Sequence, residues 1–439
     1  MKRKALAPIG IGVAVLIMAA AMFVPWAARW NVHVISFPPL HADWAPRVGP
    51  GTVPAIAIAA LIVVFARRVA LTWSWGRLLV ASFVVGVLWL TSLALVDGWD
   101  GIGHILGTNY EYLQTARSVT DFAATLREYV SRIPFDHPQN WPVHIAGHPP
   151  GALLFFVGLV KIGLGSGLAA GFVVILVAST TSVAVLLTLK RLGAEPWARK
   201  AAPFLVAGPA AIWMAVSADA VFGAVAAWGI CALTYAATSV TMPSRVLWSI
   251  GSGLILGYGV MMSYGFVLVG VVALAVLFIT RSWWPLPIAA VAALAVVLAF
   301  AAFGFAWWEA YPVLVQRYWD GVASRRPGSY WIWGNFGALV FSAGPLVGAA
   351  VAVALGRRRS WSRRSGADTV AILAIAGLAM VLAADVSGMS RAEVERIWLP
   401  FVPWMLVGTA LLPPRWARIG LVLQLSFALV VQHLLFTGW

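Results

Sequence analysis

The chain has 439 residues, of which 62% are hydrophobic and only 10% are charged, and its net charge is +15. One water-soluble core could not bury this much apolar surface, so the composition excludes a soluble globular protein and predicts an integral membrane protein. The basic residues lie in short clusters between apolar segments, which argues against nucleic acid as a partner and favours a role in membrane topology.

Apolar runs recur along the whole chain, and each of about 17 to 25 residues is long enough to cross a bilayer as a helix. The runs lack the alternation of a β-barrel, so the expected fold is all-α: a polytopic membrane helix bundle in one domain, residues 1–439, with no separate soluble domain. Lys2, Arg3 and Lys4 precede the first run, and no convincing cleavage site follows it. We therefore expect a retained first helix that starts in the cytoplasm.

Counting forward from this start gives about 13 transmembrane helices, within a range of 11 to 14. The expected spans are 8–24, 53–65, 78–96, 168–189, 201–216, 220–237, 247–261, 266–279, 287–305, 336–355, 370–384, 399–411 and 420–435. Segment 151–164 either crosses or lies at the interface, and the sequence leaves this open. We expect a short interfacial helix there, since another crossing would place Lys190 and Arg191 outside.

The loops on the outer side are then 25–51, 97–148, 307–334 and 385–397. Of the 15 acidic residues, all except Glu195 and Asp368 fall on that side. Any chemistry is therefore expected at the outer face.

Two acids lie where the third expected span leaves the membrane. Asp97 and Asp100 flank Gly98 and Trp99, at a depth where a carboxylate is costly to hold and is more often functional than accidental. Neighbours can set the pKa and orientation of such a group, which suits a general base or a partner for a cation. The alternative is a solvated helix terminus. We expect the catalytic acid here, at Asp97 first and at Asp100 second.

Further along the same loop, Glu111 stands between Tyr110 and Tyr112. The aromatic rings could stack on a sugar, or they could belong to the aromatic belt at the membrane interface. Tyr110 and Glu111 are therefore candidates for substrate binding.

The loop also holds His137, His144 and His148 together with Asp136, which raises the question of a metal site. The spacing and the prolines indicate loop geometry rather than a helical histidine pair, so no metal site is expected.

His148 is followed by Pro149-Pro150-Gly151, and proline is tolerated only in the first turn of a helix. This places His148 at a helix N-terminus, where free N–H groups favour an anion such as phosphate. We expect His148 to bind a substrate phosphate.

Asp219, in Ser217-Ala-Asp219, begins a later span. It is either a cap for that helix or a partner for a buried base or substrate. The sequence leaves both possibilities open.

Arginines stand in the last two outer loops, in sequence positions suited to phosphate oxygens. Arg325 and Arg326 lie in loop 307–334, while Glu395 and Arg396 lie in loop 385–397, directly before an apolar run. Arg396 is the best phosphate ligand among them, and Glu395 is a candidate to hold an arginine in place.

Taken in order, these elements resemble the GT-C superfamily of membrane glycosyltransferases that use polyprenyl-phosphate sugars. The resemblance covers about 78–411 and rests on an acid after an early span, on His148-Pro-Pro-Gly151, on Pro209 with Ser217-Ala-Asp219-Ala, and on Glu393-Val-Glu395-Arg396. It is closest to actinobacterial cell-envelope members that transfer mannose or arabinose. The chain departs from that pattern in having two extra spans before the acid, an unusual Asp97-Gly-Trp-Asp100 pair and no soluble C-terminal carbohydrate domain.

The resemblance implies transfer of a sugar, with inversion, to a glycan or lipid-linked acceptor on the outer face of a bacterial plasma membrane. It implies a polyprenyl-phosphate sugar as donor, with the first-loop acid as base, and no cofactor; the need for a divalent metal stays open. Two alternatives remain: a transporter or flippase of lipid-linked glycans, and a non-catalytic envelope assembly protein.

Overall fold

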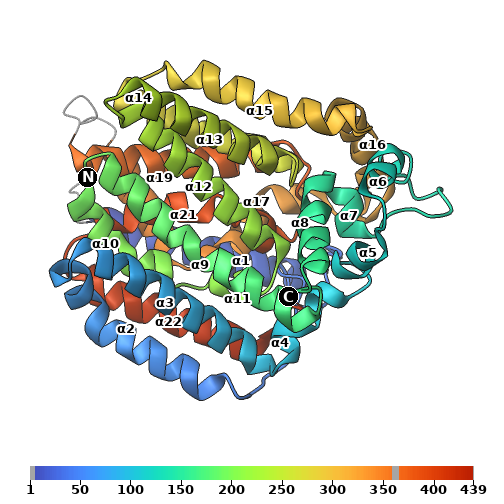
Figure 1. Ribbon diagram of the computed structural model, residues 1–439. Coiled ribbons are helices and arrows are strands. Elements are labelled where there is room, and N and C mark those ends of the chain that lie inside the picture. Colours follow the sequence, from blue (N-terminus) through green and yellow to red (C-terminus); the bar gives the residue numbers. More distant parts are fainter. Residues whose placement is uncertain (1–4, 358–364, 439) are drawn as a thin grey trace.

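The computed structural model describes residues 5–357 and 365–438 as a bundle of helices (Figure 1). Lys2, Arg3 and Lys4, and the arginines at 358, 359, 363 and 364, which support the predicted topology, lie outside the described residues. The all-α bundle predicted from the continuous apolar runs is confirmed.

Within the described residues, eight helices are long and apolar enough to cross a membrane. They are α1 (Leu6–Ala28), α2 (Thr52–Thr72), α3 (Trp75–Ala94, continued by a 3-10 turn to Asp97), α9 (Gly167–Arg191), α12 (Ala218–Thr238), α15 (Pro285–Ala302), α19 (Gly366–Val386) and α22 (Trp416–Leu434). A ninth span results if α17 (Gly328–Ala343) and α18 (Leu346–Leu355), bent by 108°, are counted together. These helices fit a multi-pass protein in a lipid bilayer, while the count of thirteen stays a prediction.

The remaining expected spans correspond to shorter or less apolar helices. These are α10 (Glu195–Val206) with α11 (Ala211–Met214), α13 (Met242–Val260), the 3-10 helix Tyr264–Val269 with α14 (Gly270–Thr280), and α21 (Val402–Leu406) with the 3-10 helix Val407–Leu411. Two of the expected continuous spans are broken, at Gly208-Pro209 and at Gly344-Pro345, because proline lacks the N–H that a helix interior needs.

The break between α17 and α18 is bridged by a side chain of α22. Gln424 is fully buried; its Oε1 accepts the Leu346 N–H at 3.2 Å, and its Nε2 donates to the Ala343 carbonyl at 2.8 Å. Gly344 lies between them with φ +79°, and a side chain there would collide with Gln424. Backbone groups released inside a membrane must be paired by the protein itself, and Gln424 does this.

Short helices gather at one side of the molecule, which we call the loop end (Figure 1). They are α4 (Asp100–Gly103), α5 (Leu113–Ser118), α6 (Phe122–Glu128), α7 (Val143–Gly147), α8 (Pro150–Lys161), α16 (Trp307–Asp320), α20 (Val394–Ile397) and the 3-10 helices Ile105–Gly107 and Val322–Ser324. The helix expected after residue 150 is present as α8, and its 12 residues extend about 18 Å, less than the hydrocarbon thickness. Much of the predicted loop 307–334 is helical.

A two-stranded antiparallel ribbon joins distant parts of the chain. Strand β1 (Asp43–Trp44) pairs with β2 (Leu435–Phe436), so that Asp43 faces Phe436 and Trp44 faces Leu435. The ribbon fastens the loop between α1 and α2 to the segment that follows α22.

Candidate functional site

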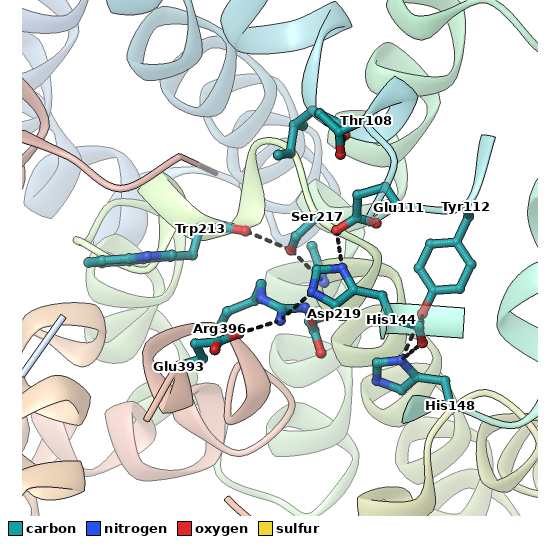
Figure 2. A network of polar contacts seen from close by, with 12 residues as sticks. Thr108, Glu111, Tyr112, His144, His148, Trp213, Ser217, Asp219, Glu393 and Arg396 are labelled. Atoms are coloured by element: carbon teal, nitrogen blue, oxygen red, sulfur yellow. Dashed lines mark hydrogen bonds and ion pairs between the residues drawn. The ribbon is translucent and has the colours of Figure 1, made fainter. Parts of the chain in front are cut away.

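A network of buried polar side chains joins three segments of the loop end to the start of α12 (Figure 2). Glu111 Oε1 lies 2.7 Å from His144 Nδ1, and His144 Nε2 lies 3.4 Å from an Arg396 Nη2. The other terminal nitrogen of Arg396 donates to Asp219 Oδ2 at 2.5 Å. All four side chains are buried. Three of them, Glu111, Asp219 and Arg396, were expected from the sequence to contribute to substrate binding.

Asp219 is positioned by the start of α12, the most deeply buried span, of which 83% of the most apolar stretch is inside the protein. Ser217 is the N-cap: its Oγ accepts the Ala220 N–H at 3.3 Å and donates to the Trp213 carbonyl at 2.7 Å. Since Ser217 performs the capping, the Asp219 carboxylate is left to pair with Arg396. The choice that the sequence left open is thereby decided in favour of a partner for a buried base.

Arg396 lies on α20 and is held by a second acid from its own turn. Glu393 Oε2 accepts from Arg396 Nη2 at 3.3 Å, and Glu393 Oε1 accepts from Arg326 Nη2 at 3.2 Å. Although burial alone would raise it, the two guanidinium groups lower the pKa of Glu393 to about 2. Ala392 and Glu393 both have positive φ, of 73° and 62°, a backbone conformation that costs energy and is concentrated at functional sites.

Glu395 is also buried in this turn, and its Oε2 has no hydrogen-bond partner. Burial, with a further contribution from the charge of Glu393, raises the pKa of Glu395 to about 8. The carboxyl is therefore protonated at neutral pH, and an uncharged group does not serve as the ionic support for an arginine that the sequence suggested.

His148 lies directly before α8, as predicted, but its ring is turned toward the protein. Its Nδ1 lies 2.7 Å from the His144 carbonyl oxygen and 2.8 Å from the Tyr112 hydroxyl, and its ring packs on Phe222 at 5.3 Å between centroids. Burial lowers the pKa of His148 and keeps the imidazole neutral. The Gly151 N–H at the start of α8 already donates to the Met261 carbonyl at 2.7 Å, so it does not serve as a phosphate donor.

Asp97 lies in a different set of contacts. Arg47 makes a two-pronged ion pair with its carboxylate, and Gln432 Nε2 donates to Asp97 Oδ2 at 2.9 Å. Both carboxylate oxygens are therefore engaged, by residues from the β1 loop and from α22.

The other predicted residues lie at the surface. Asp100 is exposed at the start of α4, Tyr110 has 63% of its surface exposed, and Arg325 is exposed beside the buried Arg326. These three side chains are not part of the network, whereas their neighbours Glu111 and Arg326 are.

Two important side chains were missed by the sequence reasoning. His144 was assigned to a loop, but it lies on α7, and His148 is the C-cap of that helix. Their four-residue separation was the available signal. Arg47 had no signal beyond being one of two arginines in loop 25–51.

Two cavities lie in the membrane-spanning part, and the smaller one approaches the network. One of about 300 Å³ lies between α2, α3 and α10, and a second of about 40 Å³ lies between α3, α9, α12 and α21. Val206 lines both cavities. The second also reaches Ala220, directly after Asp219, and Leu399, three residues after Arg396.

Among residues 5–357 and 365–438, no three His, Cys, Asp or Glu side chains are grouped so that they could hold a metal ion. A comparison with protein-family models finds no matching family, and a comparison with curated proteins finds no matching relative.

Proposed function

We propose that this protein is a membrane glycosyltransferase that moves a sugar from a polyprenyl-phosphate donor to a glycan or glycolipid acceptor at the outer face of a bacterial plasma membrane. The observation that carries the proposal is the pairing of an acid with an arginine in one buried network: Glu111 has one oxygen held by His144, and Arg396 lies on the other side of that imidazole. Sugar transfer from a lipid phosphate needs a base for the acceptor hydroxyl and a cation for the leaving phosphate.

Glu111 is the better candidate for the base. Its Oε2 is buried and has no hydrogen-bond partner, so that oxygen is available to an acceptor hydroxyl while His144 orients the carboxylate. Both oxygens of Asp97, by contrast, are occupied by Arg47 and Gln432. We therefore propose Glu111 as the catalytic base, in place of Asp97 and Asp100, which the sequence suggested.

Arg396 and Arg326 are suited to the phosphate. A guanidinium is permanently charged and presents several donors to phosphate oxygens, and in a site without water such a charge stabilises a leaving anion strongly. Asp219 and Glu393 hold the two arginines in place. In this scheme the acceptor oxygen bonds to the anomeric carbon as the bond to the phosphate oxygen breaks. Glu111 takes the proton, and the electron pair leaves with the polyprenyl phosphate.

One such displacement inverts the anomeric centre and needs a single base, unlike the paired carboxylates of a retaining hydrolase. Since Glu111 is only 1% exposed, the acceptor has to displace part of its cover, and we expect a conformational step before the chemistry. The larger cavity, between α2, α3 and α10, is suited to the isoprenoid chain of the donor, because its lining is almost entirely hydrocarbon.

The test compares Glu111→Gln with Asp97→Asn in purified protein supplied with radiolabelled polyprenyl-phosphate sugars and envelope glycan acceptors. We expect Glu111→Gln to reduce transfer by at least about a hundredfold, the usual scale for a general base, with donor binding retained. Asp97→Asn should keep transfer within a few-fold. The reverse result would return the base to Asp97, and no transfer from any donor by the wild type would refute the enzyme.

A second candidate function is a flippase of lipid-linked glycans, and the 108° bend between α17 and α18 favours it, since broken helices are common in transporters. In liposomes loaded with a fluorescent lipid-linked glycan, a flippase would move the lipid across the bilayer without any acceptor. A transferase would leave its distribution unchanged.

A further inference from the structure

A third cavity, of about 260 Å³, lies at the loop end, apart from the buried network. It is formed by α5, α6 and the segment before α7, which Figure 1 shows close together. Most of its lining side chains are polar: Thr115, Ser118, Thr120, Asp121, Thr125, Glu128 and Arg132, with Trp141 and Pro142 forming part of the wall. We call it the polar cleft.

The wall of the polar cleft is held firmly. Trp141 is 2% exposed, and its Nε1 donates to the Tyr129 carbonyl at 2.9 Å. The guanidinium of Arg132 lies 3.5 Å from the centre of the Trp141 ring and donates through Nε to the Gln139 carbonyl at 2.7 Å. A ligand would therefore meet a preformed surface and would not have to order it.

The surface of the polar cleft is rich in hydrogen-bond acceptors. Ser118 Oγ donates to the Thr115 carbonyl and Thr125 Oγ1 to the Asp121 carbonyl, each at 2.8 Å, so both hydroxyl protons are used and the two oxygens can act only as acceptors toward a ligand. Asp121 and Glu128 add two carboxylates against the single positive charge of Arg132. Such a lining repels anions and suits a neutral ligand that carries many hydroxyl donors, which is the chemistry of a saccharide.

Two of the segments that form the polar cleft lead along the chain to residues of the network. Pro142 lines the cleft two residues before His144, and Thr115 lines it four residues after Glu111. Chain segments of these lengths span at most about 7 Å and about 14 Å. The cleft therefore lies within reach of a saccharide whose end is at the proposed base.

We propose that the polar cleft binds neutral sugar units of the acceptor, so that the preferred acceptor is an oligosaccharide whose terminal hydroxyl reaches Glu111 while its inner units lie along α5 and α6. This inference rests on the proposed function only for the direction in which the bound saccharide runs. The cleft itself can be tested without any transfer reaction.

The experiment measures binding of a monosaccharide, a disaccharide and a tetrasaccharide to the full chain in lipid nanodiscs, by saturation-transfer NMR and calorimetry, with linear mannose and arabinose oligosaccharides as probes. Glu128→Gln combined with Asp121→Ser removes both carboxylates, and the serine can still cap α6. Asp136→Asn, which changes an exposed acid of the same loop outside the cleft, is the matched control.

We expect the tetrasaccharide to bind more tightly than the monosaccharide, and the double variant to weaken tetrasaccharide binding at least about tenfold while the control does not. In transfer assays the double variant should raise KM for the long acceptor by a similar factor and leave kcat and the short acceptor unchanged. Absent or length-independent binding, or equal affinity in the double variant, would overturn the proposal. Length-dependent binding without any transfer would support the cleft and refute the glycosyltransferase.

Discussion

The bridge that Gln424 makes across the broken span gives the sharpest prediction about stability. Gln424→Leu keeps the volume of the side chain but leaves the Leu346 N–H and the Ala343 carbonyl without partners at a site with no exposed surface. An unpaired buried polar group costs about 1 to 3 kcal/mol, so the two together should lower the free energy of unfolding by about 2 to 6 kcal/mol. Unfolding in mixed detergent micelles, followed by tryptophan fluorescence, measures the difference.

Gln114→Leu is the matched control. Gln114 also donates to a backbone carbonyl, that of Gly107 at 2.7 Å, but it is exposed on α5, where water replaces the lost bond. Its effect should stay within about 0.5 kcal/mol. If Gln424→Leu were equally mild, the break would have another source of pairing, and the role assigned to Gln424 would be wrong.

Two further predictions concern the network. The pKa of Glu395 is raised from 4.5 to about 8, so the folded protein keeps a proton that the unfolded chain releases. The free energy of unfolding should therefore fall as the pH rises from about 4.5 to about 8 and then level off. Glu395→Gln should flatten this part of the pH profile of thermal unfolding. Asp219→Ala should cost about 3 to 5 kcal/mol, because it removes a partner of a buried charge, and the double variant Asp219→Ala with Arg396→Met should recover much of that loss without restoring transfer. Strictly additive losses in the double variant would show that the pair does not act as a unit.

Hydrophobic pattern was enough to predict a helix bundle, because each long apolar run has one stable form in a bilayer. It also identified the short helix α8, whose start is marked by Pro149 and Pro150. It did not reveal the bend at Gly344-Pro345, because the helices on both sides of the break are apolar. The Gly-Pro pair was the local signal.

At the candidate site, the residue types indicated which side chains belong to the network, but not which side chains they contact. Glu111, Asp219 and Arg396 were identified one at a time, but their contacts join positions up to 252 residues apart, as for His144 and Arg396. Such distances are set by how helices pack, which local sequence does not encode. The ion pair of Asp97 was missed for the same reason. The position of Asp97 at the end of a span suggested chemistry, but its contact with Arg47 depends on how the loop that carries β1 packs against that span.

The contacts of Asp97 also bear on the order in which the molecule is assembled. Gln432 follows Asp97 by 335 residues, and the strand that pairs with β1 comes directly after α22. During synthesis, therefore, the loop carrying Arg47 is made long before the strand that pairs with β1, and it can adopt its final form only after α22 has been made. A ribosome stalled before residue 432 would hold a chain whose first loop is still digestible by protease, whereas release past Phe436 would protect it.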